Sequence, residues 1–292
     1  MQTIGFIGLG NMGGGMAANL VKAGFTVFGT DISDAAMARA EAAGVEPVAA
    51  MPDGLDAVIA MLPDSPQVEA CFLGPDGLLP RLAPGTLVME SSTIAPATTD
   101  KLAAACAEAR LDFMDAPVGR SPIEAAAGKL LFMIGAEADT LARARPLIDA
   151  MGEVVHHCGG IGSGIRTKLV NNMLSQATGQ LSAEALALGL KLGLERDTLL
   201  GIMTGSLASN RFLADYWPVK VLAGDTTPGF AIGLSAKDLR LAIAMAEDAG
   251  APVPTGAAAA GAVAAASKTD GEVDVSGLLN VALRNAGLGE VE

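Results

Sequence analysis

The sequence predicts an α/β protein whose first half forms a doubly wound, mostly parallel sheet and whose second half is all α-helical. Three observations lead to this prediction. Short β-prone runs alternate with helical patterns up to about residue 160, a glycine cluster follows at 159–164, and no clear strand appears beyond it. Because the 292 residues exceed the usual size of one hydrophobic core, we expect two domains, residues 1–162 and residues 163–292.

The expected strands of the first domain are short apolar and β-branched runs. They lie at residues 4–7, 26–30, 57–61, 86–89 and 130–134. In the second domain, a stretch without proline from residue 165 to about 192 repeats apolar residues at helical spacing, which predicts one long helix starting at the domain boundary. Further helices are expected at residues 196–204, 237–249 and 254–267.

Composition and charge exclude several classes of partner. The formal net charge is −13 and the chain has no run of Lys or Arg, so nucleic acids and anionic membranes are not expected partners. No apolar stretch is long enough to span a bilayer and no export signal is evident, which favours the cytoplasm. Three scattered cysteines without a CxxC pair predict neither a disulfide framework nor a metal site. A small molecule remains the expected partner.

A glycine-rich loop between the first strand and the first helical pattern predicts a dinucleotide site. It has the spacing GxGxxG and consists of Gly8, Leu9, Gly10, Asn11, Met12 and Gly13. Glycines allow the backbone to approach a pyrophosphate closely, and the following helix N-terminus offers free N–H groups to it. The order strand, loop and helix is that of a Rossmann-type domain.

The nature of the dinucleotide is indicated by Asp31, which follows the second strand. A carboxylate at this point suits the two ribose hydroxyls of NAD and repels the 2′-phosphate of NADP. No Arg follows it immediately, so NAD (NADH) is the expected cofactor. An alternative for this residue alone is a cap for the helix that begins near Ser33 and Asp34.

Four polar side chains share one face of the long helix predicted from residue 165. They occur at positions i, i+3, i+4 and i+7 and are Lys168, Asn171, Asn172 and Ser175. An ammonium beside a nicotinamide would protonate the alkoxide formed from a carbonyl, and the amides would orient the substrate. A solvated polar stripe is the alternative. Two adjacent Asn residues in mid-helix speak against it, because Asn is a poor helix former.

With these motifs in this order, the whole chain resembles the β-hydroxyacid dehydrogenases, which include 3-hydroxyisobutyrate dehydrogenase and tartronate semialdehyde reductase. The resemblance rests on residues 8–13, 18–20, 61–63, 91–93, 115–118, 168–175, 230 and 234–239. It implies that Lys168 is the catalytic lysine and that Asn171 and Asn172 bind and position the substrate. It further implies cofactor contacts from Leu62, Pro63, Thr93, Phe230 and Lys237, and association of the chain into a homo-oligomer, either a dimer or a tetramer.

One segment departs from the common family pattern. Typical members carry Ser-Gly-Gly after residues 115–118 to receive a carboxylate, whereas this chain has Gly119, Arg120 and Ser121. The planar guanidinium suits bidentate binding of an anion. Gly-Arg at this place resembles the sulfolactaldehyde reductases of sulfoquinovose breakdown. The expected reaction is therefore reduction of 3-sulfolactaldehyde to 2,3-dihydroxypropane-1-sulfonate.

Other interpretations stay open for Arg120 and for the reaction. Arg120 could instead form a surface salt bridge. The substrate could be a carboxylated compound such as succinic semialdehyde, tartronate semialdehyde or 3-hydroxyisobutyrate. A decarboxylating reaction would need more basic contacts for its sugar phosphate than the sequence provides. A non-catalytic dinucleotide-binding protein should have lost Lys168, Asn172 and Lys237, which are all present.

Overall fold

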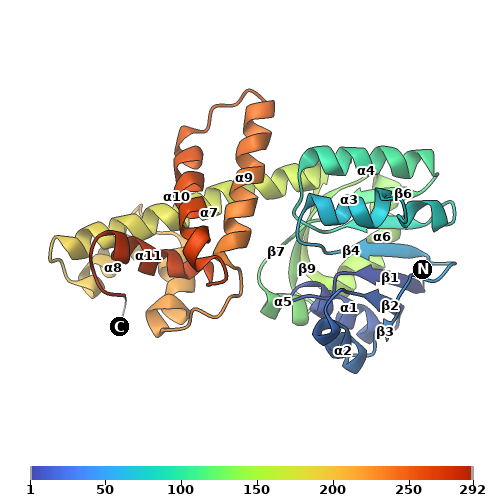
Figure 1. Cartoon of the computed structure of the whole chain (residues 1–292), viewed down its shortest axis with the longest axis horizontal. Coiled ribbons are helices and arrows are strands. Elements are labelled where there is room, and N and C mark those ends of the chain that lie inside the picture. The colour runs from blue at the N-terminus through green and yellow to red at the C-terminus, as the bar shows by residue number, and fades with distance from the viewer. Residues whose placement is uncertain (1, 291–292) are drawn as a thin grey trace. The chain divides into compact units, whose positions relative to one another are not determined.

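The computed structural model describes residues 2–290 and divides the chain into two compact units, Met1–Lys168 and Leu169–Glu292 (Figure 1). The first unit contains a sheet of nine strands in the order β3-β2-β1-β4-β5-β6-β8-β7, with β9 pairing to β8. The strands are β1 (Thr3–Ile7), β2 (Thr26–Thr30), β3 (Glu46–Pro47), β4 (Ala57–Ala60), β5 (Leu87–Glu90), β6 (Asp112–Asp115), β7 (Val118–Gly119), β8 (Leu130–Gly135) and β9 (Gly152–Gly159).

Most of these strands are parallel, which confirms the predicted doubly wound, Rossmann-type sheet. The exceptions are the two antiparallel pairings of β8 with β6 and with β7. All five predicted strands form. Sequence patterns missed β3 and β7, which have two residues each, and also β6 and β9, whose sequences are partly polar. Such segments lack the continuous apolar run of a strand buried on both faces.

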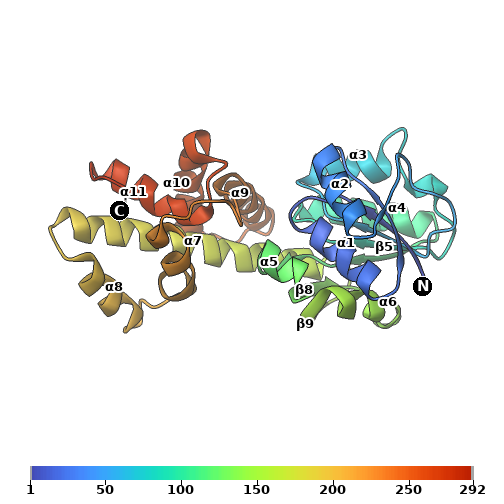
Figure 2. The same cartoon turned by 90° about the horizontal axis from the view of Figure 1, so that it is seen from below.

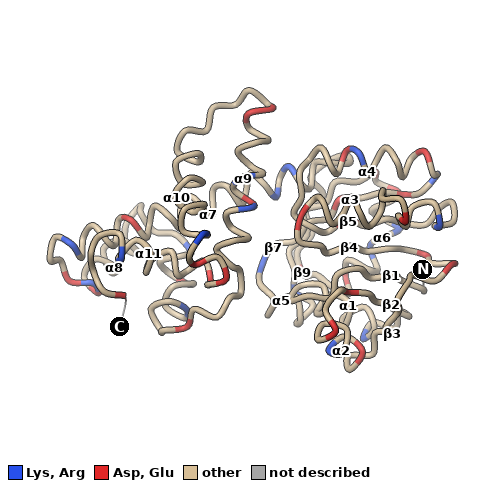
Figure 3. Tube along the Cα trace, viewed as in Figure 1, with Lys and Arg blue, Asp and Glu red and all other residues tan. Residues whose placement is uncertain are grey.

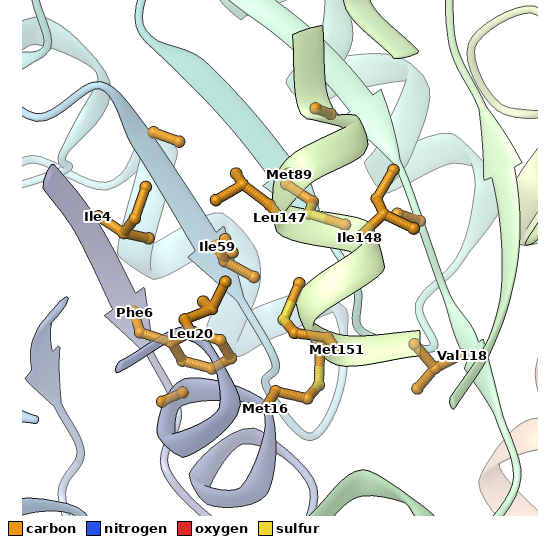
Figure 4. Packing of buried hydrophobic residues seen from close by; sticks show 14 of the residues in the cluster. Ile4, Phe6, Met16, Leu20, Ile59, Met89, Val118, Leu147, Ile148 and Met151 are labelled. Atoms are coloured by element: carbon orange, nitrogen blue, oxygen red, sulfur yellow. The ribbon is translucent and has the colours of Figure 1, made fainter. Parts of the chain in front are cut away.

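Helices cover both faces of this sheet (Figure 1). They are α1 (Gly13–Lys22), α2 (Asp34–Ala42), α3 (Ser65–Leu73), α4 (Pro96–Glu108), α5 (Pro122–Ala126) and α6 (Ala138–Met151). Successive strand residues alternate between the two faces: Ile59 packs in a core with α1, α2, α5 and α6, whereas Val58 packs with α3 and α4. Figure 4 shows the first of these cores, where Met16 and Leu20 of α1 lie near Met151 of α6.

The helix α7 (Ser163–Lys191) has 29 residues and begins at the predicted domain boundary. The second unit continues with α8 (Arg196–Thr204), α9 (Ile232–Asp248), α10 (Pro254–Asp270) and α11 (Leu278–Asn285). Figure 2 shows α9, α10 and α11 on one side of α7. Short helical turns complete the chain at η1 (Leu79–Arg81), η2 (Phe212–Tyr216), η3 (Trp217–Val219), η4 (Val221–Ala223) and η5 (Val275–Gly277).

The helical second unit agrees with the sequence prediction, apart from one helix start and one missed helix. Helix α9 begins at Ile232, five residues before the predicted start, because Gly233 and Ser235 interrupt its apolar pattern. Helix α11 has eight residues, too few for a helical repeat of apolar residues to be recognised in the sequence. Its Leu279 and Leu283 pack with Trp217 and Leu186 in a core of the second unit.

Charged residues are scattered along the trace, and Lys and Arg form no run (Figure 3). Within residues 2–290, no helix is both long and apolar enough to cross a membrane. The same residues contain no group of three or more His, Cys, Asp or Glu side chains able to hold a metal ion. Cys71, Cys106 and Cys158 are free thiols.

Candidate active site

The glycine loop joins the end of β1 to the start of α1, as the motif requires. Gly8 has φ +89°, a left-handed conformation that favours glycine. A Cβ at Gly13 would lie 1.9 Å from the carbonyl oxygen of Gly8, so no larger residue fits there. At Gly10, by contrast, a Cβ would meet no atom within 4 Å. The loop is therefore tight against itself on one side and open beside Gly10, which is the space that a pyrophosphate needs.

A pocket of about 270 Å³ adjoins this loop within the first unit. It is lined by Leu9, Gly10, Asn11, Gly14, Gly15, Arg39, Ala40 and Pro122. Arg39 adds a positive charge to a lining whose other residues are uncharged. Because α1 starts at Gly13 without a side-chain cap, its first N–H groups are directed to the loop. These features fit a dinucleotide diphosphate.

Asp31 lies just after β2 and touches the glycine loop. Its Oδ2 accepts a hydrogen bond of 2.6 Å from the Leu9 N–H, and its Oδ1 accepts one of 2.8 Å from the Ser33 N–H. The N-cap of α2 is Ser33, whose hydroxyl accepts from the Ala36 N–H. Asp31 is therefore not the helix cap, and its half-buried carboxylate stands at the position where a ribose hydroxyl is bound in NAD domains.

Two further loops leave the carboxyl ends of β4 and β5, the edge of a parallel sheet at which ligands bind. The first contains Leu62 and Pro63 and the second contains Ser92 and Thr93. They are tied together because the Leu62 N–H donates a 2.8 Å hydrogen bond to the Ser92 hydroxyl. Leu62 and Thr93 are half-buried and Pro63 is exposed, so the predicted nicotinamide-side residues reach the surface of the unit.

The carboxyl group of Glu90 lies directly beneath these loops and is only 1% exposed. Its Oε1 accepts a 2.6 Å hydrogen bond from the Ser92 N–H. Burial raises the pKa of Glu90 to about 7, the negative charge of Asp115 adds to the rise, and hydrogen bonds from Ser92 oppose it. Neither the sequence pattern nor the resemblance pointed to this residue.

Lys168 lies in the second turn of α7, and its side chain is half-buried. Its Nζ donates a 2.7 Å hydrogen bond to the carbonyl oxygen of Val118. The start of α7 is fixed by Asp115, whose Oδ1 accepts from the Gly162 N–H at 2.6 Å and whose Oδ2 accepts from the Ile165 N–H at 2.7 Å. The structure therefore places the ammonium directly beside the segment that begins at Gly119.

Within that segment, Arg120 has φ +79°, a conformation uncommon for a residue with a side chain. The Nη1 of Arg120 donates hydrogen bonds of 2.6 Å to the Lys129 carbonyl and to Glu153 Oε2. Its side chain is 31% exposed. Ser121 is the N-cap of α5 and forms a capping box with Glu124. Arg120 thus follows by two residues the Val118 carbonyl that accepts from Lys168, but its guanidinium already has an anionic partner in Glu153.

In the second unit, Asn171, Asn172 and Lys237 belong to one hydrogen-bonded group around Asp238. The Nδ2 of Asn172 donates to Asp238 Oδ2 at 2.7 Å, and the Nζ of Lys237 lies 3.1 Å from Asp238 Oδ1. Asn171 Nδ2 donates to Asn172 Oδ1 at 3.1 Å. Asp238 is 2% exposed and joins α9 to α7. The role of Asp238 was not predicted from the sequence, although its place directly after Lys237 was a usable signal.

Ser175 and Phe230 complete the predicted set, and both are half-buried. The Phe230 N–H donates a 3.2 Å hydrogen bond to the buried carboxylate of Asp274. The same Asp274 oxygen accepts from the Gly229 N–H and from the Tyr216 hydroxyl, both at 2.9 Å. Asp274 therefore holds the loop that presents Phe230.

Two protein-family models match the chain along most of its length. The one described as the NAD binding domain of 6-phosphogluconate dehydrogenase matches residues 3–160. The one described as the NAD-binding domain of NADP-dependent 3-hydroxyisobutyrate dehydrogenase matches residues 162–282. The 3-hydroxyisobutyrate dehydrogenase of Pseudomonas aeruginosa is 41% identical over 281 residues, covering 93% of this chain and 94% of the relative. The chain belongs to the β-hydroxyacid dehydrogenase family.

Other members of the family differ in the substrates that their names state. The NAD-dependent L-serine dehydrogenase of P. aeruginosa is 43% identical over 265 residues, covering 88% of this chain and 89% of the relative. The 3-sulfolactaldehyde reductase of Escherichia coli is 39% identical over 261 residues, covering 88% and 87%. The solved structure of Mycobacterium tuberculosis 3-hydroxyisobutyrate dehydrogenase with L-serine has a TM-score of 0.88 at 35% identity, covering 96% of this chain and 99% of that one.

Membership in the β-hydroxyacid dehydrogenase family confirms the predicted class of enzyme and its cofactor. The protein is an NAD(H)-dependent oxidoreductase of the hydroxyacid dehydrogenase type. The constricted turn at Gly8 and Gly13 and the open space beside Gly10 fit this cofactor. The identity of the substrate is a separate question, since the names of relatives with similar identity include L-serine, a sulfonated aldehyde and 3-hydroxyisobutyrate.

Proposed function

We propose that this β-hydroxyacid dehydrogenase reduces 3-sulfolactaldehyde to 2,3-dihydroxypropane-1-sulfonate with NADH. The observation that carries the proposal is the hydrogen bond from Lys168 Nζ to the Val118 carbonyl. It brings a proton donor within two residues of Arg120, the charged residue that replaces a glycine of the common family pattern. A proton donor held at Val118 and an anion-binding residue two positions further along the same segment suit a short aldehyde that carries a sulfonate.

The proposed reaction divides the work among a few side chains. NADH, when bound, supplies the hydride for the aldehyde carbon. Lys168 protonates the developing alkoxide, and in reverse it accepts the hydroxyl proton. Arg120, Asn171 and Ser175 bind the sulfonate, and Asn172 orients the substrate. Asp31 and the loop from Gly8 to Gly13 bind the adenosine and diphosphate half of the cofactor, while the predicted contacts to its other half come from Leu62, Pro63, Thr93, Phe230 and Lys237.

Glu153 would compete with the anionic group of the substrate for Arg120. In the structure the two side chains form an ion pair with a 2.6 Å contact, and the Glu153 carboxyl is half exposed. Exposed ion pairs contribute little free energy, so a bound sulfonate has only a small cost to overcome when it displaces Glu153. Charge-assisted hydrogen bonds from the planar guanidinium to two sulfonate oxygens would exceed that cost.

A second candidate is oxidation of a carboxylated β-hydroxyacid such as L-serine or 3-hydroxyisobutyrate. The specific observation in its favour is that the Arg120 guanidinium already binds Glu153 and the Lys129 carbonyl. If Arg120 keeps these contacts when the substrate binds, other groups of the site must bind the substrate carboxylate, as in family members that lack an Arg here. The relative named for L-serine is 43% identical to this chain.

A substrate panel separates the two candidates. The experiment measures kcat/KM of the purified protein for reduction of 3-sulfolactaldehyde, succinic semialdehyde and tartronate semialdehyde, and for oxidation of L-serine and 3-hydroxyisobutyrate. Each reaction is run with both NAD(H) and NADP(H). The proposal expects the largest value for 3-sulfolactaldehyde with NADH. A larger value for a carboxylated compound would replace it with the second candidate.

The proposed assembly is a homo-oligomer, a dimer or tetramer, built on an apolar stripe of α7. The stripe consists of Val170, Leu174, Leu181 and Leu188 on the helix and Leu192 directly after its last residue, and these side chains are between 56% and 70% exposed. Spacings of four and seven residues place these side chains along one side of the helix. A row of exposed leucines on a long helix is self-complementary when two copies pack about a twofold axis. The proposed compartment is the cytoplasm, where a soluble pool of NAD(H) is available.

A further inference from the structure

The buried Glu90 joins the two loops that are proposed to contact the nicotinamide half of the cofactor. Its Oε1 accepts a 2.6 Å hydrogen bond from the Ser92 N–H. The Ser92 hydroxyl in turn accepts a 2.8 Å hydrogen bond from the Leu62 N–H. A continuous chain of hydrogen bonds therefore runs from the end of β5 to the loop after β4.

The location of Glu90 makes this chain rigid. The residue is the last of β5, and its backbone pairs with Asp115 of β6 on one side and Ala60 of β4 on the other. Its side chain is 1% exposed, and among residues 2–290 its Oε2 has no hydrogen-bond partner. Burying a carboxyl group with one oxygen unsatisfied costs free energy. The fold retains this carboxyl group despite that cost.

The neighbouring Ser91 shows that this arrangement is specific to Ser92. Ser91 is equally buried, at 1% exposed, yet its hydroxyl has no hydrogen-bond partner within the described residues. The two adjacent serines are equally buried, but only the hydroxyl of Ser92 connects the loops. They provide a matched pair for an experiment.

We propose that Glu90 is a positioning residue for the nicotinamide half of NAD(H), because through Ser92 it fixes the Leu62–Pro63 loop against the Ser92–Thr93 loop. The inference rests on the proposed contacts of Leu62, Pro63 and Thr93 with that half of the cofactor. It does not depend on which substrate the enzyme uses. Glu90 itself is buried under Ser92 and acts only through the loops.

The test measures binding of two ligands by calorimetry on the full-length protein without substrate. NADH carries the nicotinamide, whereas ADP-ribose has the same adenosine diphosphate and ribose but lacks it. Glu90→Leu and Ser92→Ala should each weaken NADH binding about tenfold and leave ADP-ribose binding unchanged. Ser91→Ala should change neither value. Glu90→Gln keeps an oxygen acceptor for the Ser92 N–H and should restore NADH binding to within about twofold of the original.

The outcomes separate positioning from general damage. Thermal unfolding of each variant shows whether the protein is folded, and Ser92→Ala provides the test if Glu90→Leu does not fold. Equal weakening of NADH and ADP-ribose would overturn the proposal, because it indicates a loss of structure around the whole cofactor site. Unchanged NADH binding in folded Glu90→Leu or Ser92→Ala would also overturn it. Failure of the sulfonate assignment would appear only in the substrate panel and would leave these binding constants as they are.

Discussion

The ammonium of Lys168 combines a fixed position with access to the segment that is proposed to bind the substrate. Replacing it by Ala removes the proton donor while α7 and the glycine loop keep their contacts. We expect Lys168→Ala to lower kcat by a factor of about 10² to 10⁴ and to leave the dissociation constant of NADH, measured by calorimetry, close to the original.

Lys168→Arg is the matched variant, since it keeps the positive charge but holds its proton too tightly to donate it. Turnover by this variant should be nearly as low as that of Lys168→Ala. Substantial activity of either protein would remove Lys168 from the proton transfer.

Arg120 and Glu153 give opposite predictions for the same measurement. Arg120→Ala should raise KM for the anionic substrate by about 10- to 150-fold, the loss of about 1.5–3 kcal/mol of charge-assisted hydrogen bonding, with a smaller change in kcat. Glu153→Gln should lower KM, because it releases the guanidinium from its ion pair.

The backbone of Arg120 supplies the control for this pair of variants. At φ +79° glycine is comfortable and alanine is strained. Arg120→Gly should therefore show the same KM as Arg120→Ala while unfolding at a higher temperature. If KM is unchanged in both variants, Arg120 serves only the ion pair with Glu153.

Among the helices, α7 and α9 are joined by buried polar contacts, one of which centres on Asp238 and another of which links Ser235 to Gln176. Asp238 of α9 holds both Asn172 and Lys237. Asp238→Asn removes the carboxylate next to the Lys237 ammonium and presents an NH₂ group to one of the two donors. We expect kcat/KM to fall at least about tenfold and the midpoint of thermal unfolding to drop, since breaking buried charge pairs is costly. An unchanged kcat/KM would show that the positions of Asn172 and Lys237 do not depend on Asp238.

The elements also show what the sequence could and could not reveal. Helix α7 was predictable because 29 residues give many repeats of one period, and β1 was predictable from its apolar run before the glycine loop. Strand β7 was not, since its two residues form a strand only by pairing with β8. Lys168 and Asn172 stood out by spacing. Glu90 and Asp238 did not, because their importance comes from burial and partners that only the folded chain brings together.

The stability of the folded protein should depend on pH through Glu90. Its pKa is about 7 in the folded chain against 4.5 in the unfolded one, owing chiefly to burial. Between these values the unfolded chain has released the proton and the folded chain retains it, so this group makes stability fall as pH rises from 4.5 to about 7. The titratable groups that face Glu90 are Asp115 of β6 and Cys71 of α3. Both side chains are present in the original protein and in the Glu90→Gln variant used to test this prediction.

Glu90→Gln removes the titrating carboxyl group of Glu90 and keeps every other titratable side chain. The variant should therefore lack this pH dependence of stability. In urea unfolding, the free energy of unfolding of the variant relative to the original should rise by about 2 kcal/mol between about pH 5.5 and about pH 8. Parallel pH profiles of the two proteins would show that the carboxyl group of Glu90 titrates normally.

At the scale of the whole molecule, the apolar stripe of α7 is proposed to hold copies of the chain together. Removing exposed apolar side chains from water is favourable, so a stripe of five that meets its own copy favours association into a dimer. Leu181→Lys with Leu188→Lys places two positive charges in that contact. Because both positions are exposed within the single chain, the fold itself should be unaffected.

Light scattering after size-exclusion chromatography measures the outcome. The original protein should elute as an oligomer and the double variant as a species of smaller mass with an unchanged circular dichroism spectrum. Leu207→Lys is the control, because Leu207 is fully exposed but lies outside α7. An original protein that elutes as a monomer, or a double variant that remains an oligomer, would show that the stripe is not the contact between copies. If the double variant is monomeric and has also lost turnover, oligomer formation is required for a competent site as well as for assembly.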